Sequence, residues 1–317
     1  MKKAIFKIFG LALLAASVFV SCYDAPVEFI KSDVIEYLGN GVMEGKLEED
    51  YTLSATVSYR LTGSFIVAEG AKLTIPAGTN IAAEAGGTGV YLAVLMGGKI
   101  EINGTSGSPV VMSSANANAG DWGGLTICGK ATTSAGENAE AEVGGFIYGG
   151  SNDTDNSGSI RYLVIKGTGA QINEESQYNG VSFYAVGSGT TVENVAVING
   201  SDDGVEFFGG TVSVSNLFLQ NNEDDAIDWT EGWSGTVTNA YVEHTINGFS
   251  TVVEADKANA NPKLINLTAV STTGGTALQF KKASGATVTG LSLSGYSTTV
   301  ELKDPDQGSY ANIIIDG

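Results

Sequence analysis

Six acidic side chains near the middle of the sequence form two groups with the same internal spacing. Each member of the second group follows its counterpart by 22 residues (224 − 202, 225 − 203 and 228 − 206): Asp202, Asp203 and Glu206, then Asp224, Asp225 and Asp228. If 22 residues make one structural repeat, each carboxylate lies about 5 Å from its counterpart, where like charges repel. A bound calcium ion, a raised pKa or solvation of splayed turn side chains would each offset this repulsion. The sequence therefore predicts a calcium site, tuned catalytic acids or a solvated turn.

Aromatic residues accompany these acids. Phe207 and Trp229 occupy equivalent positions in the two repeats, and we expect them to stack in the core. Phe208, Trp233 and, one repeat earlier, Tyr184 are left for the surface. Rings beside carboxylates can hold a sugar, because the ring covers its apolar face while the acids accept its hydroxyl groups. We therefore predict these three residues as ligand-binding residues.

Short strands must position these side chains. From Tyr51 onward, brief runs of Val, Ile, Leu and Thr alternate with Gly, Asn, Ser and Asp, without a helical period. Six segments align with apolar first, fourth and sixth positions, and their third positions are residues 194, 216, 239, 266, 290 and 312. Five of these six are Asn, which would form a ladder of amide hydrogen bonds between stacked strands. The pattern predicts an all-β, right-handed parallel β-helix of roughly ten or eleven coils.

The first 50 residues differ from the rest. Lys2, Lys3 and Lys7 precede an apolar run from residue 8 to residue 20, as in a signal peptide. The run ends in Ser21-Cys22, which is similar to the lipobox of lipoproteins and implies that Cys22 is acylated. We predict a signal peptide over 1–21, a lipidated tether over 22–50 and the β-helix over 51–317. Residues 137–159, rich in Gly, Asn and Asp, are expected to project from one flank as a loop.

Charge and rare residues exclude several functions. The net charge is −19, so phosphate backbones would be repelled and nucleic acid is excluded as a partner. One histidine, His244, cannot build a multi-histidine zinc site. If Cys22 carries lipid, the other cysteine, Cys128, has no partner for a disulfide and is expected to be a small buried residue.

Several segments carry a resemblance to a known family. The chain resembles Gram-negative bacterial lipoproteins with right-handed parallel β-helix repeats over nearly all of its predicted mature part. The resemblance rests on the glycine-rich and acidic stretches at residues 61–81, 120–131, 156–162, 201–210 and 224–229. It implies the fold and an exported, outer-membrane location, on the periplasmic face or at the cell surface.

The acidic repeats also resemble polygalacturonases, which are glycoside hydrolases built on a parallel β-helix. In that family, paired aspartates are followed by a histidine and a lysine. The matching residues here are, in order, Asp203, Asp224, Asp225, His244 and Lys281. The resemblance implies that they act as general acid and general base on a glycosidic bond. The sequence departs from the family in having no glycine beside His244 and Gln279 in place of an arginine.

Three classes of function follow from these observations. The first is a non-catalytic lipoprotein that binds a poly- or oligosaccharide or acts as an adhesin, and it is the one we favour. The others are a polysaccharide-degrading enzyme of the polygalacturonase or lyase type, and a purely structural surface protein. The predicted partners are the membrane, through Cys22, and a glycan. Residues 312–316 form an apolar end strand, which predicts self-association, a covering partner or a chain shorter than its relatives.

Overall fold

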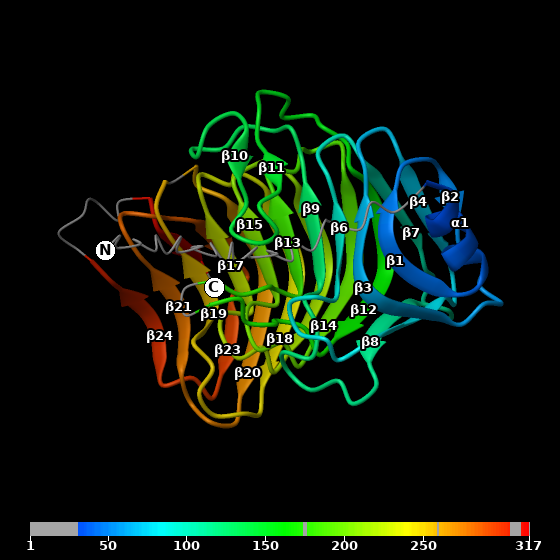
Figure 1. The fold of residues 1–317 in the computed structure, drawn as a ribbon. Helices are drawn as coiled ribbons and strands as arrows, with labels where there is room; N and C mark the ends of the chain where they lie inside the picture. The colour runs from blue at the N-terminus through cyan, green and yellow to red at the C-terminus, as the bar shows by residue number, and fades with distance from the viewer. Residues whose placement is uncertain (1–30, 174–175, 259, 305–311, 317) are drawn as a thin grey trace, which may run out of the picture.

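The computed structural model describes residues 31–173, 176–258, 260–304 and 312–316. Within these residues there is one helix, and a sheet of 23 strands continues through the whole molecule (Figure 1). The described elements are, in chain order, α1 (Lys31–Gly39), β1 (Val42–Leu47), β2 (Tyr51–Thr52), β3 (Tyr59–Val67), β4 (Lys72–Pro76), β5 (Asn80–Ala83), β6 (Tyr91–Val94), β7 (Lys99–Asn103), β8 (Val110–Ser114), β9 (Leu125–Cys128), β10 (Ala139–Glu140), β11 (Ile147–Tyr148), β12 (Gly158–Lys166), β13 (Val181–Tyr184), β14 (Thr191–Ile198), β15 (Val205–Phe208), β16 (Ser213–Gln220), β17 (Ile227–Thr230), β18 (Thr236–His244), β19 (Thr251–Ala255), β20 (Lys263–Ser271), β21 (Thr276–Phe280), β22 (Thr287–Thr289), β23 (Ser292–Ser294), β24 (Thr298–Leu302) and β25 (Ile314–Asp316).

The strands stack in three parallel faces around a common core. Face 1 contains β2, β4, β7, the first halves of β12, β14, β16, β18 and β20, then β22 and β25. Face 2 contains the starts of β1 and β3, then β5, β8, the second halves of the same five long strands, and β23. Face 3 contains the ends of β1 and β3, then β6, β9, β13, β15, β17, β19, β21 and β24.

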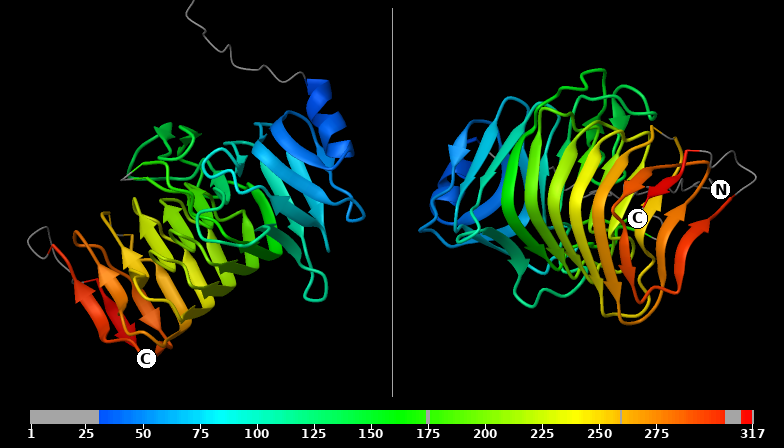
Figure 2. Two further views of the ribbon diagram at one scale, coloured as in Figure 1. Left: turned by 60° about the horizontal axis from the view of Figure 1, so that its bottom comes forward. Right: turned by 180° about the vertical axis from the view of Figure 1, so that it is seen from behind.

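Each face therefore has ten rungs, and the chain makes ten coils along one axis (Figure 2). The predicted parallel β-helix and its number of coils are confirmed. Alternation of side chains places the apolar positions inside, as in β16, where Val214, Leu217 and Leu219 are buried.

The predicted asparagine ladder lies at the corner between faces 1 and 2. Asn194, Asn216, Asn239 and Asn266 all have a left-handed backbone, with φ between 57° and 59°. Their side-chain amides hydrogen-bond from coil to coil at 3.1, 3.0 and 3.0 Å. Asparagine is one of the few residues that tolerate this conformation, so the same residue both turns the chain and joins adjacent coils.

The ladder gives a direct prediction for Asn239. Asn239→Gly keeps the left-handed turn but removes two amide hydrogen bonds, and we expect it to cost about 1–3 kcal/mol of unfolding free energy. Asn239→Ala should cost about 1 kcal/mol more, because alanine is strained at positive φ. Thermal unfolding of both variants, with Thr238→Ala as an outward-facing control, measures the difference. A glycine variant as stable as the parent would show that the ladder contributes nothing.

The last coil differs from the sequence alignment. β25 pairs with β22 so that Val288 lies beside Ile315, a step of 27 residues, whereas the alignment placed Val288 opposite Tyr310. Asn312 is therefore outside the ladder. The run Ile313-Ile314-Ile315 carries no alternation that fixes its register, which explains the error. Ile314 and Ile315 are exposed at this end of the stack, and the partner expected there stays a prediction.

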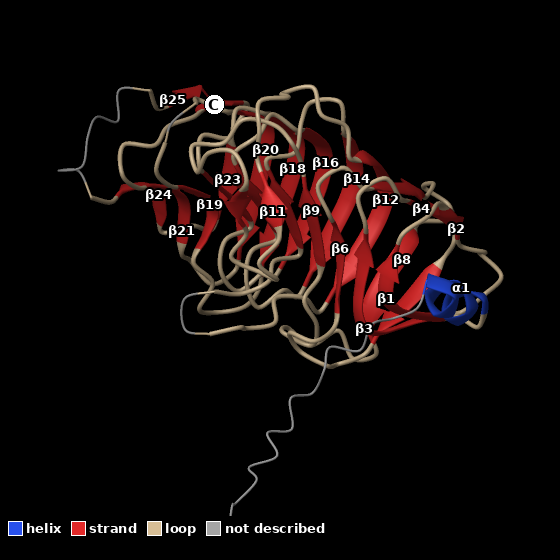
Figure 3. Ribbon diagram, turned by 45° about the horizontal axis from the view of Figure 1, so that its top comes forward, coloured by secondary structure: helices blue, strands red, loops and turns tan. Residues whose placement is uncertain are grey.

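The other end of the stack is covered by α1 (Figure 3). Val34 and Leu38 of this helix are buried in the main core, and β1 pairs with β3. The folded region thus begins before residue 51, inside the stretch predicted as a tether. The predicted signal peptide over 1–21 and Cys22 lie outside the described residues. No helix in the described part of the chain has the length and hydropathy needed to cross a membrane.

Candidate functional site

The acidic side chains come together on face 3. Because β15 pairs with β17, Glu206 lies beside Asp228, as the 22-residue spacing predicted. In the turn that leads into these strands, the backbone N–H of Asp225 donates to Oδ1 of Asp203 at 2.9 Å. Gly204 makes this close stacking possible, since an added Cβ would lie 2.6 Å from the carbonyl oxygen of Ala226.

The same register continues into the next coil. Asp228 pairs with Glu254 on β19, and Glu254 pairs with Gln279 on β21. The sequence analysis missed Glu254 because this coil is longer, so the 22-residue spacing is lost, although an acid still stands between two apolar residues. We call the seven acidic residues the acidic column: Asp202, Asp203, Glu206, Asp224, Asp225, Asp228 and Glu254.

Most of the acidic column is buried. Asp203 and Asp225 are 5% and 3% exposed, and Glu206, Asp228 and Glu254 are 8% to 9% exposed. Asp224 at the corner is only partly buried. The solvated-turn interpretation is therefore wrong for the buried members, because water cannot surround their carboxylates.

Burial here results from a segment that we call the cover, residues 131–157. It contains the antiparallel pair β10–β11 and folds back onto the outer side of face 3, instead of projecting as expected (Figure 1). Tyr148 of the cover packs on Tyr184 with ring centroids 4.9 Å apart, and Tyr184 stacks on Phe208 at 4.0 Å. Together with Cys128, these rings belong to a second apolar cluster outside the main core.

Neighbouring polar groups satisfy only part of the acidic column. Asn179 Nδ2 donates to Glu206 at 2.6 Å, Thr251 Oγ1 donates to Asp225 at 2.5 Å, and the Lys281 ammonium pairs with Glu254. Within the described residues, Asp228 Oδ1 and Asn179 Oδ1 are buried without a hydrogen-bond partner. Two unpartnered oxygens in one buried cluster are costly, since each has lost its water.

The electrostatics of the acidic column favour protonation when nothing else is bound. Burial, first, and the neighbouring carboxylates, second, raise the pKa of Asp203, Glu206, Asp225 and Asp228 well above the ordinary range. For Asp202 the same causes raise the pKa to about 8. The acids therefore need protons or a cation to be stable in this position.

The geometry of the acidic column suits a divalent cation with oxygen ligands. One carboxylate oxygen from each of Asp203, Glu206 and Asp228 lies within 4.8 Å of the other two. The same holds for Asp202, Asp203 and Asp224 at the corner. Calcium binds oxygens at about 2.3–2.6 Å, so two ligands on opposite sides of the ion are about 5 Å apart.

His244 lies apart from the acidic column. It ends β18 on face 2 and is buried against Phe249, with ring centroids 3.7 Å apart, while Nδ1 is 3.0 Å from the hydroxyl of Tyr296. Burial alone lowers its pKa to about 4, with no contribution from a carboxylate. Of the residues matched to polygalacturonases, Asp203, Asp224, Asp225 and Lys281 come together but His244 does not join them.

The three predicted ligand-binding rings do not form an exposed surface. Phe208 is 5%, Tyr184 1% and Trp233 0% exposed. Trp233 stacks on Phe207 at 4.1 Å and donates its indole N–H to the carbonyl oxygen of Val212 at 2.9 Å. The expectation of exposed rings is therefore wrong, because the cover buries Tyr184 and Phe208 and the core takes Trp233. The expected core positions of Phe207 and Trp229 are confirmed.

Comparison with known proteins agrees with this architecture. No curated protein matches the sequence significantly. The family model of the pectate-lyase-like β-helix domain matches residues 45–316, which contain nearly all of β1 and every later strand. The chain therefore belongs to the pectate-lyase-like β-helix domain family.

Proposed function

We propose that this chain is a non-catalytic, lipid-anchored surface β-helix protein whose acidic column binds a divalent cation, with calcium as the preferred ion. The observation that carries the proposal is the buried trio of Asp203, Glu206 and Asp228, next to two oxygens without hydrogen-bond partners. A cation would coordinate these oxygens and offset the repulsion between the carboxylates.

Charge balance supports a cation over protonation alone at neutral pH. Lys281 is the basic side chain that pairs with the acidic column, and its ammonium is engaged by Glu254 at one end. The remaining buried carboxylates have no such partner among the described residues. Hard oxygen ligands of this kind favour calcium over softer transition metals.

Two features support a non-catalytic role. A general acid and base must reach the glycosidic oxygen and the attacking water from both sides of the bond, yet Asp203 and Asp225 are buried below the cover. His244 has its ring enclosed by Phe249 and Tyr296. The described structure therefore offers a polysaccharide no exposed pair of acids on face 3.

Export and anchoring rest on the amino-terminal sequence. The lysines, the apolar run and Ser21-Cys22 support a signal peptide and acylation of Cys22. Labelling of cells with a radioactive fatty acid tests this part: the chain should incorporate the label, and Cys22→Ala should not. A labelled Cys22→Ala variant would exclude Cys22 as the anchor.

The cation part predicts a calcium-dependent melting temperature. After chelation, calcium at 100 times its dissociation constant should stabilise the full chain by about 2.7 kcal/mol, which is about 5–10 °C. Magnesium should stabilise it less, because its small octahedral shell fits a fixed cluster of carboxylates poorly.

The same preparation tests the catalytic alternative, since we expect no release of reducing ends or unsaturated products from pectin-type polysaccharides. An unchanged melting temperature would refute the cation. Product release that Asp225→Asn abolishes would refute the non-catalytic role.

A further inference from the structure

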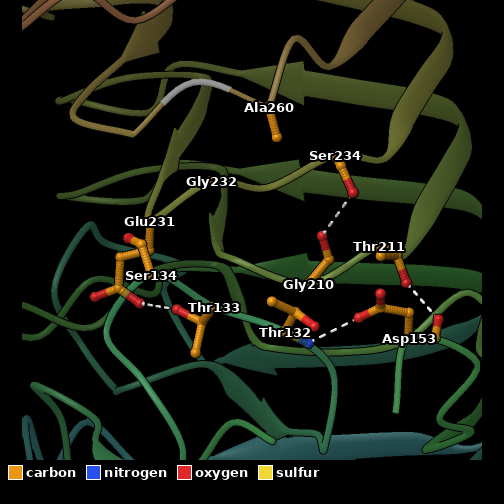
Figure 4. Close-up of a pocket in the computed structure, with 10 residues that line it drawn as sticks. All are labelled: Thr132, Thr133, Ser134, Asp153, Gly210, Thr211, Glu231, Gly232, Ser234 and Ala260. Carbon is orange, nitrogen blue, oxygen red and sulfur yellow. Dashed lines mark hydrogen bonds between the residues drawn. The ribbon is translucent and has the colours of Figure 1, made fainter. Parts of the chain in front are cut away.

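A cavity of about 330 Å³ lies outside the acidic column, at the corner where face 3 turns into face 1. Its walls come from the cover and from the turns that follow β9, β15 and β17, so several successive coils contribute (Figure 4). Cavities of 300 Å³ and above are large enough for a small organic ligand. No residue predicted from the sequence as a site lines it.

Two carboxylates face each other across this cavity, and each is held by one oxygen (Figure 4). Glu231 Oε2 accepts hydrogen bonds from Thr133 Oγ1 at 2.7 Å and from the Tyr148 hydroxyl at 2.8 Å. Asp153 Oδ1 accepts the backbone N–H of Thr132 at 2.9 Å. Among the described residues, Glu231 Oε1 and Asp153 Oδ2 take no hydrogen bond and are left for a ligand.

The backbone at Glu231 is left-handed, with φ of 57°. Gly209 and Ala185 adopt the same conformation at this position of the two preceding coils, so the turn itself does not require a glutamate. A side chain as long as glutamate is strained there by about 1 kcal/mol or more. Its carboxylate is nevertheless fixed by two hydrogen bonds, which is the preorganisation expected of a binding group.

The remaining lining selects the chemistry of the ligand. Ser134 and Thr132 are exposed hydroxyl groups at the rim, and Ser234 donates to the carbonyl oxygen of Gly210 at 3.3 Å on the floor. The lining contains two acids and no lysine, arginine or histidine. An anionic sugar would be repelled, whereas the hydroxyl groups of a neutral sugar can donate to the carboxylates and accept from the hydroxyls.

We propose that this cavity binds one or two units of a neutral glycan, with Glu231 and Asp153 accepting hydrogen bonds from adjacent sugar hydroxyls. The site lies apart from the buried rings that the sequence suggested, and it uses no member of the acidic column. The inference goes beyond the proposed function, because it does not depend on the cation.

Isothermal titration of the full chain in detergent with neutral trisaccharides built from glucose, mannose or xylose tests the site. Trigalacturonic acid serves as the anionic probe and chitotriosan as the cationic one. At least one neutral trisaccharide should bind, and Glu231→Gln and Asp153→Asn should each weaken that binding tenfold or more. Ser134→Trp, an exposed substitution that fills the cavity, should abolish it without altering the circular dichroism spectrum. Glu137→Gln, an exposed acid of the cover outside this cavity, is the charge-matched control.

Each outcome decides. Neutral binding that is lost in Ser134→Trp and kept in Glu137→Gln supports the site. Absence of binding to all three neutral sugars, binding that survives Ser134→Trp, or a preference for trigalacturonic acid or chitotriosan overturns it. Repeating the titration in chelator separates the two proposals: the glycan affinity should be unchanged there, whatever calcium does to the melting temperature.

Discussion

Asp228→Asn is expected to stabilise the chelated protein at pH 8 and to abolish the stabilisation by calcium. Asp228 is a buried member of the acidic column, and its Oδ1 has no hydrogen-bond partner in the described structure. Without a cation its negative charge is destabilising, so a neutral amide of the same shape removes a cost of a few kcal/mol. With calcium present the same substitution removes a ligand.

The pH dependence follows from the same charges. The pKa of Asp228 and of its neighbours is raised in the folded chain, while the unfolded values lie near 4. Between pH 4 and about 8, the value of Asp202, the folded chain therefore holds more protons than the unfolded chain. The unfolding free energy of the chelated protein falls as the pH rises through this range. The amide introduced by Asp228→Asn has no proton to lose over this range, so the variant should lose less stability than the parent.

Melting temperatures at pH 5 and pH 8, each with chelator and with calcium, measure this effect. We expect the parent chain in chelator to melt several degrees higher at pH 5 than at pH 8, and Asp228→Asn to narrow that gap. Glu223→Gln, an exposed acid in the turn beside Asp224, is the matched control and should behave as the parent. A variant that is destabilised in chelator at pH 8, or that still responds fully to calcium, would contradict the cation site.

Trp233→Ala is expected to lower the unfolding free energy by about 3–5 kcal/mol, since it deletes a fully buried indole. The substitution removes the stack on Phe207 and the hydrogen bond to Val212. At roughly 2–4 °C per kcal/mol, the melting temperature should fall by about 10 °C.

The control for this core position is Tyr241→Ala, an aromatic that is 39% exposed and stacks on Phe218. It should cost about 1 kcal/mol or less. If Trp233→Ala instead left the melting temperature unchanged and removed glycan binding, the tryptophan would be a ligand residue and its buried position here would be wrong.

The sequence contained the repeat itself because identical positions meet identical neighbours. Asn216 must turn the chain and bond to Asn194 and Asn239, so its residue type is constrained in every coil. For the same reason the spacing of Glu206 and Asp228 predicted their contact. Such information is local to one coil and its neighbour.

What could not be predicted depends on coil length and on contacts between distant segments. A longer coil hid Glu254, and the uniform apolar run before Asp316 hid the register of β25. Tyr184 has the composition of a surface aromatic, and only the cover, whose packing no periodicity encodes, makes it a buried one. Glu231 was missed because its partner Thr133 is 98 residues away.

That long-range contact changes how the molecule should come apart. In a plain solenoid each repeat touches only its neighbours, so melting can start anywhere and spread. Here the hydroxyl of Thr133, after β9, reaches past the coils of β13 and β15 to the carboxylate after β17, and Tyr148 joins it. This cross-brace ties four successive turns of the spiral into one cooperative block. The central third of the protein should then exchange its amide hydrogens as a unit, while the two extremities fray independently.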